Sequence, residues 1–477
     1  MNRQLSWASL AVVFGTLLTT AALGLGQDQS MPNMPMPNTP MPKVPAAGAP
    51  QEKDNVQSGL TLGELEQMAL SSNPTLAQAA AEIRAAEGRK LQSGLYPNPT
   101  VGYQGEQIRG GSQGGGEQGF FVSQEIVLGG KLGLSRRVFE QEKKQAETEG
   151  EEQRLRVINS VRLFYYQVLA AQEMVDLRRK LSQLAEDAVN TSHQLGNVGQ
   201  ADQPDVLQAE VEGEQAELAV VAAEQKQLRV WRSLAATVGK PVMPLTHLAG
   251  NLEDLPGDNP DQWLQAILQD SPAVKIAELG VLRAEASLAR AKREPIPNLQ
   301  LRGGLQQNRE LDATTNRPIG LQGFAEVGVQ IPIFNHNQGN VQASRADIER
   351  AQREVERVQL VLRERAAALV QNYLTSRAMV EKYRSRMIPR AQKAYDLYVK
   401  SYGGMAAAYP QVLMSQRTLF QLKTDYISAL ETLWGNSIAL KGFLLTDGLE
   451  APSRPGEMDQ PVRELNVPSS TPSMQPQ

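Results

Sequence analysis

The strongest constraint on the fold is an internal duplication with a period near 200 residues. Three prolines of the first half recur in the second half at a constant spacing: Pro74 and Pro272, Pro97 and Pro295, and Pro99 and Pro297. Further along the chain the spacing lengthens slightly, as between Pro204 and Pro410. A repeat this long does not fit the short units of a solenoid. We therefore predict two copies of one domain half, residues 59–250 and 251–446.

Both ends of the chain differ in composition from the duplicated part. Residues 1–26 carry Arg3 followed by an apolar run that ends in small residues, which is the pattern of an export signal peptide. Residues 27–58 are rich in Met and Pro, and residues 447–477 are rich in Pro and Ser. Both segments have too few core-forming residues to fold alone, so we expect them to be disordered.

The Met/Pro segment contains the candidate metal ligands of this sequence, which are Met31, Met34, Met36 and Met41. Thioether sulfurs suit soft cations such as Cu(I) and Ag(I). The alternative interpretation is a spacer that binds no metal, because this composition is also typical of linkers.

The composition excludes several kinds of chemistry. The chain has no cysteine, which rules out disulfides, thiolate metal sites, a cysteine nucleophile and a lipid-modified cysteine. Its three histidines are far apart in sequence, at His193, His247 and His336. The net charge of −4 argues against a nucleic-acid partner. With no catalytic motif in the sequence, we predict a protein that is not an enzyme and needs no cofactor.

Each copy predicts the same order of elements. A short helix, at 75–94 or 273–292, is followed by two strands and then by a long helix, at 134–195 or 340–401. A turn and a returning helix complete each copy. The long helices are about 90 Å long at the usual rise, far more than a globular domain of this size needs. Two overlapping apolar seams on the first long helix predict two helical neighbours for it.

Alternation of apolar residues identifies the strands. In the second copy one face carries Ala325, Val327, Val329, Ile331 and Ile333. In the first copy the corresponding face carries Phe120, Val122, Ile126 and Leu128. The 206-residue spacing would put Ser123 and Glu125 on the face of Val329 and Ile331, so we expect a slip of one residue or a position below the apolar band. No segment after residue 26 has 18 consecutive apolar residues, so a membrane span would require a closed β-barrel.

This arrangement resembles the TolC-like outer-membrane efflux family over residues 60–445. The turn Asn197-Val198-Gly199, followed by Asp205, is similar to the tip of the family's first helical hairpin. The resemblance implies a mainly α protein with a β-barrel portion. It also implies a homotrimer with a 12-stranded outer-membrane barrel in lipid, which continues into a periplasmic helical barrel. Such a channel passively conducts substrates received from a periplasmic adaptor and an inner-membrane pump. The pattern is closer to the heavy-metal CzcC-type branch, with a generic export channel as the alternative.

The resemblance also implies the residues of the channel tip and of adaptor docking, which are Asn197, Val198, Gly199, Asp202, Asp205, Tyr402, Gly404, Gln411 and Met414. Two of them depart from the family pattern, because Gln411 and Met414 stand at acidic gate positions. Asp205 and Asp202 are the nearest acidic substitutes. The alternative interpretation of Asp205 is a simple helix cap.

Two other functions fit parts of the sequence. A periplasmic adaptor also has long helical hairpins, but it would carry one hairpin rather than two copies with strands. A secreted structural coiled-coil protein would leave the alternating segment 325–333 unexplained. Detection of a heat-resistant trimer in outer-membrane extracts would support only the channel.

Overall fold

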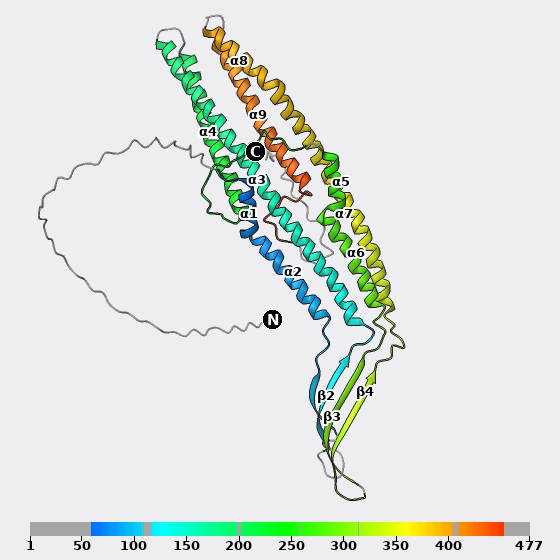
Figure 1. The fold of residues 1–477 in the computed structure, drawn as a ribbon. Helices are drawn as coiled ribbons and strands as arrows, with labels where there is room; N and C mark the ends of the chain where they lie inside the picture. The colour runs from blue at the N-terminus through cyan, green and yellow to red at the C-terminus, as the bar shows by residue number, and fades with distance from the viewer. Residues whose placement is uncertain are drawn as a thin grey trace, which may run out of the picture. The chain divides into compact units, whose positions relative to one another are not determined.

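A computed structural model describes residues 59–106, 108, 116–197, 202–257, 259–312, 314–403 and 409–452. The predicted export signal, the Met/Pro segment with its four candidate metal ligands, and residues 453–477 lie outside these ranges. Within the described part, the helices run side by side in a long body, with a small sheet at one end and two hairpin ends at the other (Figure 1).

Both repeats have the predicted order of elements. The first contains α1 (Leu62–Ser72), α2 (Pro74–Ser93), β1 (Thr100–Glu106), β2 (Glu117–Ile126), α3 (Lys131–Asn197) and α4 (Gln203–Val238). The second contains α5 (Pro260–Asp270), α6 (Pro272–Ala291), β3 (Leu299–Leu311), β4 (Pro318–Val329), α7 (Gln338–Lys382), the π-helical turn η1 (Tyr383–Met387), α8 (Ile388–Gly403) and α9 (Tyr409–Lys441). Among the described helices, none combines the length and the apolar character needed to cross a membrane.

The repeated prolines mark the starts of corresponding helices. Pro74 and Pro272 occupy the first position of α2 and α6, where a residue without an amide N–H leaves no hydrogen bond unmade. The preceding residues cap both helices: Asn73 accepts a hydrogen bond from the Thr75 amide at 2.9 Å, and Ser271 plays the same part in α6. The sequence repeat therefore places the start of a helix at the same position in each copy.

The two long helices differ. α3 is continuous over 67 residues, as predicted. The prediction of one continuous helix over 340–401 is wrong, because η1 separates α7 from α8. Pro389 is the second residue of α8, just after this turn. Proline has no amide N–H to donate to the carbonyl group one turn earlier, and its ring crowds that carbonyl. The wider π turn makes room for the ring.

The core lies in the middle of the helical body, where the chain between the two repeats crosses the helices. Trp231 is 1% exposed, and its indole N–H donates to the Met243 carbonyl at 3.1 Å. Trp434 donates in the same way to the Leu252 carbonyl at 2.9 Å and stacks on Tyr166 with ring centroids 3.8 Å apart. These two tryptophans thus hold the segment between α4 and α5 against the helices.

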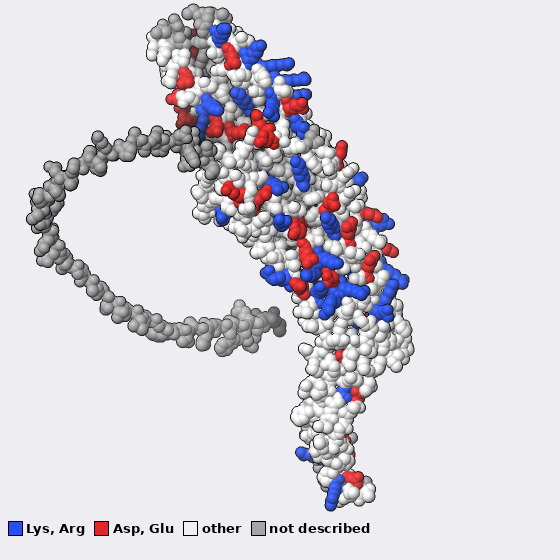
Figure 2. Space-filling view, viewed as in Figure 1, with Lys and Arg blue, Asp and Glu red and all other residues white. Residues whose placement is uncertain are grey.

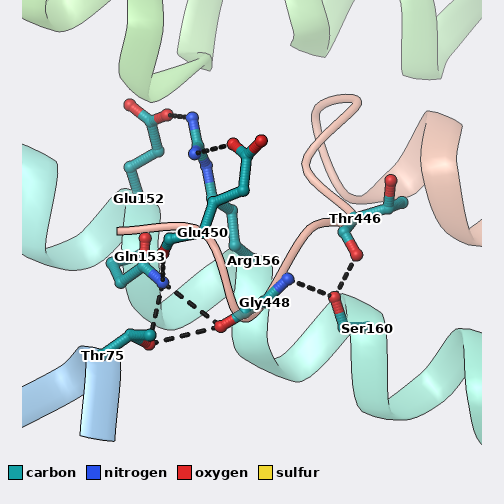
Figure 3. Close-up of polar contacts among 8 residues, drawn as sticks. All are labelled: Thr75, Glu152, Gln153, Arg156, Ser160, Thr446, Gly448 and Glu450. Carbon is teal, nitrogen blue, oxygen red and sulfur yellow. Dashed lines mark hydrogen bonds and ion pairs between the residues drawn. The ribbon is translucent and has the colours of Figure 1, made fainter. Parts of the chain in front are cut away.

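The chain after α9 is packed rather than free. Figure 3 shows residues 446–450 lying across α3: the Gly448 amide donates to Ser160 Oγ at 2.7 Å, and Gln153 Nε2 donates to the Glu450 carbonyl at 3.0 Å. Arg156 pairs with the Glu450 carboxylate at 3.3 Å. The predicted start of a disordered tail at residue 447 is therefore wrong for the stretch up to Pro452, which the structure describes.

We expect a Gly448→Ala substitution to destabilise the protein by about 1–3 kcal/mol. A Cβ at this position would lie 2.9 Å from Ser160 Oγ and 3.0 Å from the Val157 Cα, so residues 446–450 would have to move away from α3. The matched control is Gly257→Ala, where a Cβ meets no atom within 4 Å. Thermal unfolding of the two purified variants checks the difference, and equal melting temperatures would contradict it.

The sheet is antiparallel in the order β1-β2-β3-β4, so β1 and β4 are its edges. The predicted strand of the second copy extends too far, because β4 ends at Val329. Ile331 and Ile333 lie beyond it, on either side of Pro332, which has no amide N–H to give to a sheet ladder.

Candidate functional site

One face of the sheet is apolar and exposed. Directly opposed residues of neighbouring strands share a face, so Phe120, Leu305 and Gly323 lie in one row. The exposed large side chains of this face are Val101, Tyr103, Phe120, Val122, Leu305, Leu321, Val327 and Val329. Phe120 is 68% exposed and Leu305 is 60% exposed. A patch of this kind indicates contact with an apolar environment or a partner.

The pairing of strands resolves the register conflict in the sequence. Val122, Gly303 and Ala325 share a row, and Ile126 shares one with Val329 through Leu299. Ser123 therefore points to the opposite face from Val329. Of the two outcomes expected from the sequence, the structure has the slip of one residue. Ala325, Val327 and Val329 all lie on the apolar face, as their alternation predicted.

The opposite face is polar and is organised around Arg302. The guanidinium carbon of Arg302 lies 4.2 Å from the ring centroid of Phe121 and 5.8 Å from that of Phe324. Arg302 also donates to Gln104 and lies 3.7 Å from the Glu326 carboxylate. This cluster was not predicted, although the strand alternation assigns all five residues to the polar face.

A second polar cluster lies nearer the hairpin end of the sheet. Both carboxylate oxygens of Glu117 accept hydrogen bonds, one from Gln306 at 2.5 Å and the other from Asn308 at 2.7 Å. Asn308 is 3% exposed, so its amide is held in one orientation. The charged residues of this face within the paired strands are Glu106, Glu117, Glu125, Glu326 and Arg302. The face therefore carries more acidic than basic side chains.

The predicted tip residues lie at the opposite end of the molecule (Figure 1). Asn197 ends α3, and Asp202 and Asp205 begin α4, so the structure brings these three to the end of one hairpin. Val198, Gly199 and Gly404 lie outside the described residues. Tyr402 lies near the end of α8, and Gln411 and Met414 lie exposed in the first turns of α9, at the end of the other hairpin.

Asp205 is not the N-cap of α4, which was the alternative interpretation of this residue. The N-cap of α4 is Asp202, whose side chain makes no capping hydrogen bond. Asp205 lies in the first turn, where its negative charge is favoured by the helix dipole. Both side chains are exposed.

A buried carboxyl group in the helical body was not predicted. Glu149 on α3 is 8% exposed, and its Oε2 has no hydrogen-bond partner among the described residues. Burial raises the pKa of Glu149 to about 8, with further contributions from the negative charges of Glu152 and Glu82, while Arg283 acts in the opposite direction. A glutamate on a charged helix usually faces solvent, so no feature of the sequence distinguished it.

In the parts of the chain that the structure describes, no group of three or more His, Asp or Glu residues is arranged to hold a metal ion.

Comparisons with known proteins agree with this geometry. The family model described as outer membrane efflux protein matches residues 65–240 and 263–444. The cobalt-zinc-cadmium resistance protein CzcC of Cupriavidus metallidurans is 27% identical over 374 residues, which cover 78% of this chain and 86% of that protein. The solved structure of CusC has a TM-score of 0.67 at 16% identity, and the match covers 85% of this chain and 99% of that one.

The outer membrane protein VceC of Vibrio cholerae is also similar, with a TM-score of 0.65 at 18% identity over 82% of this chain and 97% of that chain. These likenesses confirm the predicted fold class, a mainly α protein with a β-barrel portion that continues into a helical barrel. They also confirm the outer membrane as its location, with the helical tunnel in the periplasm. The match over both repeats excludes the adaptor and the secreted coiled coil. The chain belongs to the outer membrane efflux protein family.

Proposed function

We propose that three copies of the chain form a passive export channel through the outer membrane. The observation that supports this most directly is the pair of sheet edges. Among the described residues, β1 pairs only with β2, and β4 pairs only with β3. In lipid every backbone N–H and C=O must be hydrogen-bonded, so an open edge cannot persist there. Pairing of β1 with β4 of the next copy closes a barrel, and three copies supply about 12 strands, within the range of such barrels.

The two faces of the sheet then have separate roles. The apolar face, with Phe120 and Leu305, contacts lipid, and the polar face, with Arg302 and Glu117, lines the channel. Four glutamates against one arginine in each copy give the lining a net negative charge. Rings of carboxylates favour cations in a pore.

We further propose that the channel carries divalent heavy-metal cations. The acidic lining and the relative named for cobalt, zinc and cadmium resistance support this substrate class. Deletion of the gene should increase the zinc, cobalt and cadmium that cells retain and lower their tolerance of these metals. Tolerance of organic dyes and drugs should not change. Loss of dye tolerance with unchanged metal retention would instead assign the chain to generic export.

The hairpin tips are the proposed docking surface for a periplasmic adaptor, which would connect the channel to an inner-membrane pump. Exposed apolar side chains near these tips support docking of a protein there. Leu207 is 51% exposed and Val211 is 50% exposed on α4, and Met414 is 71% exposed on α9. These side chains would be covered by helices of the adaptor.

A double variant, Asp202→Asn with Asp205→Asn, should lower the preference of the channel for cations in planar-bilayer recordings. Three copies would lose six carboxylates at the narrow end, and carboxylate rings concentrate cations at a pore mouth. The assembled yield should stay unchanged, because loss of a first-turn aspartate costs only about 0.3–1 kcal/mol. The matched control is Glu214→Gln with Glu217→Gln, two exposed residues farther along α4. Equal effects of both double variants would contradict a specific role for the tip.

A further inference from the structure

The connections between the sheet and the helices are strongly basic. We define the junction as residues 88–99, 127–139, 288–298 and 330–345, which include the adjoining helical turns. Its Lys and Arg residues are Arg89, Lys90, Lys131, Arg136, Arg137, Arg290, Lys292, Arg293 and Arg345. Its one acidic residue is Glu294. The whole chain has 48 Lys and Arg against 52 Asp and Glu, so this excess is local.

Figure 2 shows Lys and Arg, interspersed with Asp and Glu, over the helix ends that adjoin the sheet, whereas the sheet itself carries few charges. Four of the nine cations are engaged in ion pairs. Arg89 and Lys90 pair with acidic residues of their own helix or of α3, and Lys131 and Arg290 share Glu294.

The other five cations form a set that we call the basic girdle: Arg136, Arg137, Lys292, Arg293 and Arg345. All five are exposed, and none is in an ion pair with another described residue. Because no described acidic residue forms an ion pair with them, the girdle has the chemistry to bind external anions.

Exposed apolar and aromatic side chains, which we call the belt, lie in three of the four connections between the sheet and the helices. Its exposed members are Leu95, Tyr96, Leu128, Ile331, Ile333 and Phe334. Tyr96 is 64% exposed and Phe334 is 90% exposed. Aromatic girdles at the membrane–water interface are characteristic of outer-membrane barrels. The order from sheet to helices is therefore apolar strand face, interfacial belt and basic girdle.

We propose that the basic girdle binds the phosphate groups of anionic phospholipids in the leaflet that faces the periplasm. With the apolar sheet face in the hydrocarbon, the belt lies at the interface. Arg136 and Arg137 then lie about 8–9 Å further along α3, at the level of the headgroups. Arginine and lysine are the side chains best suited to phosphate oxygens. The proposal rests on the outer-membrane location of the chain and is independent of its cargo and of its tips.

The test uses the full-length protein in a neutral detergent with a tail-labelled phosphatidylglycerol, whose binding is followed by fluorescence anisotropy. Tail-labelled phosphatidylcholine is the neutral comparison. The protein should bind phosphatidylglycerol more tightly than phosphatidylcholine, and high salt should remove the difference. Inorganic phosphate at millimolar concentration should compete only weakly, because it lacks the acyl chains that contact the belt.

Replacing all five girdle residues by glutamine should abolish the preference for phosphatidylglycerol. A single Arg293→Gln should weaken binding roughly fivefold, as expected for one cation near an anionic surface. Arg293→Lys should retain the wild-type affinity. The matched control removes five exposed, unpaired cations away from the junction, by the changes Lys180→Gln, Arg232→Gln, Arg363→Gln, Arg390→Gln and Lys393→Gln. This control should bind as the wild type does.

Three results would overturn the proposal. One is equal binding of phosphatidylglycerol by the five-residue girdle variant and by its control. Another is equal affinity of the wild type for the charged and neutral lipids. The third is full displacement by inorganic phosphate, which would indicate a site for free anions. If the five-residue variant fails to assemble, the comparison of Arg293→Gln with Arg293→Lys decides the question. Metal retention and dye tolerance in cells test the proposed channel separately.

Discussion

A Leu305→Arg variant should fail to accumulate as an assembled channel in the outer membrane. Leu305 lies at the middle of β3 on the apolar face and is 60% exposed in one copy of the chain. An arginine at the midplane on the lipid face of a barrel costs about 2–4 kcal/mol, and the proposed trimer contains the substitution three times. We therefore expect near-complete loss of the heat-modifiable band of the assembled protein on semi-native gels of outer-membrane extracts.

The neighbouring residue provides the matched control. Gln306 points to the opposite face and donates to the Glu117 carboxylate, so an arginine at this position meets a negative charge in the proposed channel. Gln306→Arg should assemble normally. If the two variants assemble equally well, the apolar face of the sheet does not contact lipid.

Glu149→Gln should make the protein more stable in alkaline solution and leave its stability nearly unchanged near pH 4.5. The pKa of Glu149 is raised from its ordinary value of 4.5 to about 8, so the folded state binds this proton more tightly than the unfolded state does. The free energy of unfolding therefore falls as the pH rises from 4.5 to 8 and levels off above that range. The full loss is about 5 kcal/mol at most, and the glutamine variant should recover most of it.

Thermal unfolding of the detergent-purified protein between pH 4.5 and 9 measures this effect. The matched control is Glu217→Gln, which removes an exposed carboxylate from α4 and should follow the wild type at every pH. If Glu149→Gln shows the same pH dependence as the wild type, the carboxyl group is hydrated in the assembled protein and its pKa is ordinary.

Much of the fold could be predicted because the residues that mark the starts of helices and the positions of strands recur in both halves of the chain. The prolines at the starts of α2 and α6 and the alternation around Val327 are local signals, and each depends on backbone geometry that neighbouring residues determine. The break at η1 was missed because a proline inside a long helical pattern can kink, end or widen the helix, and the sequence does not decide between these outcomes.

The site was predicted less well, because its residues come together through long-range contacts. Arg302, Phe121 and Gln104 lie on three different strands, and their contacts depend on the exact strand register. Gly304 shows how strict this register is, because a Cβ there would lie 2.2 Å from the Phe120 carbonyl oxygen. The packing of residues 446–452 was missed for a related reason: they look like a tail in composition and are held by residues of α2 and α3 that are distant in sequence.

The closed barrel is tested most directly by cross-linking its proposed seam. Because the natural chain has no cysteine, two introduced cysteines are the only thiols: Val101→Cys on β1, combined in turn with Leu321→Cys, Ala325→Cys, Val327→Cys or Val329→Cys on β4. Within one copy β1 and β4 are about 14 Å apart across the sheet, too far for a disulfide, so any bond must join two copies. Oxidation of intact outer membranes should yield, for at least one pair, a covalent ladder that ends at the trimer. Assembled protein that forms no cross-link with any pair, or a ladder that ends at the dimer, would contradict the trimeric channel.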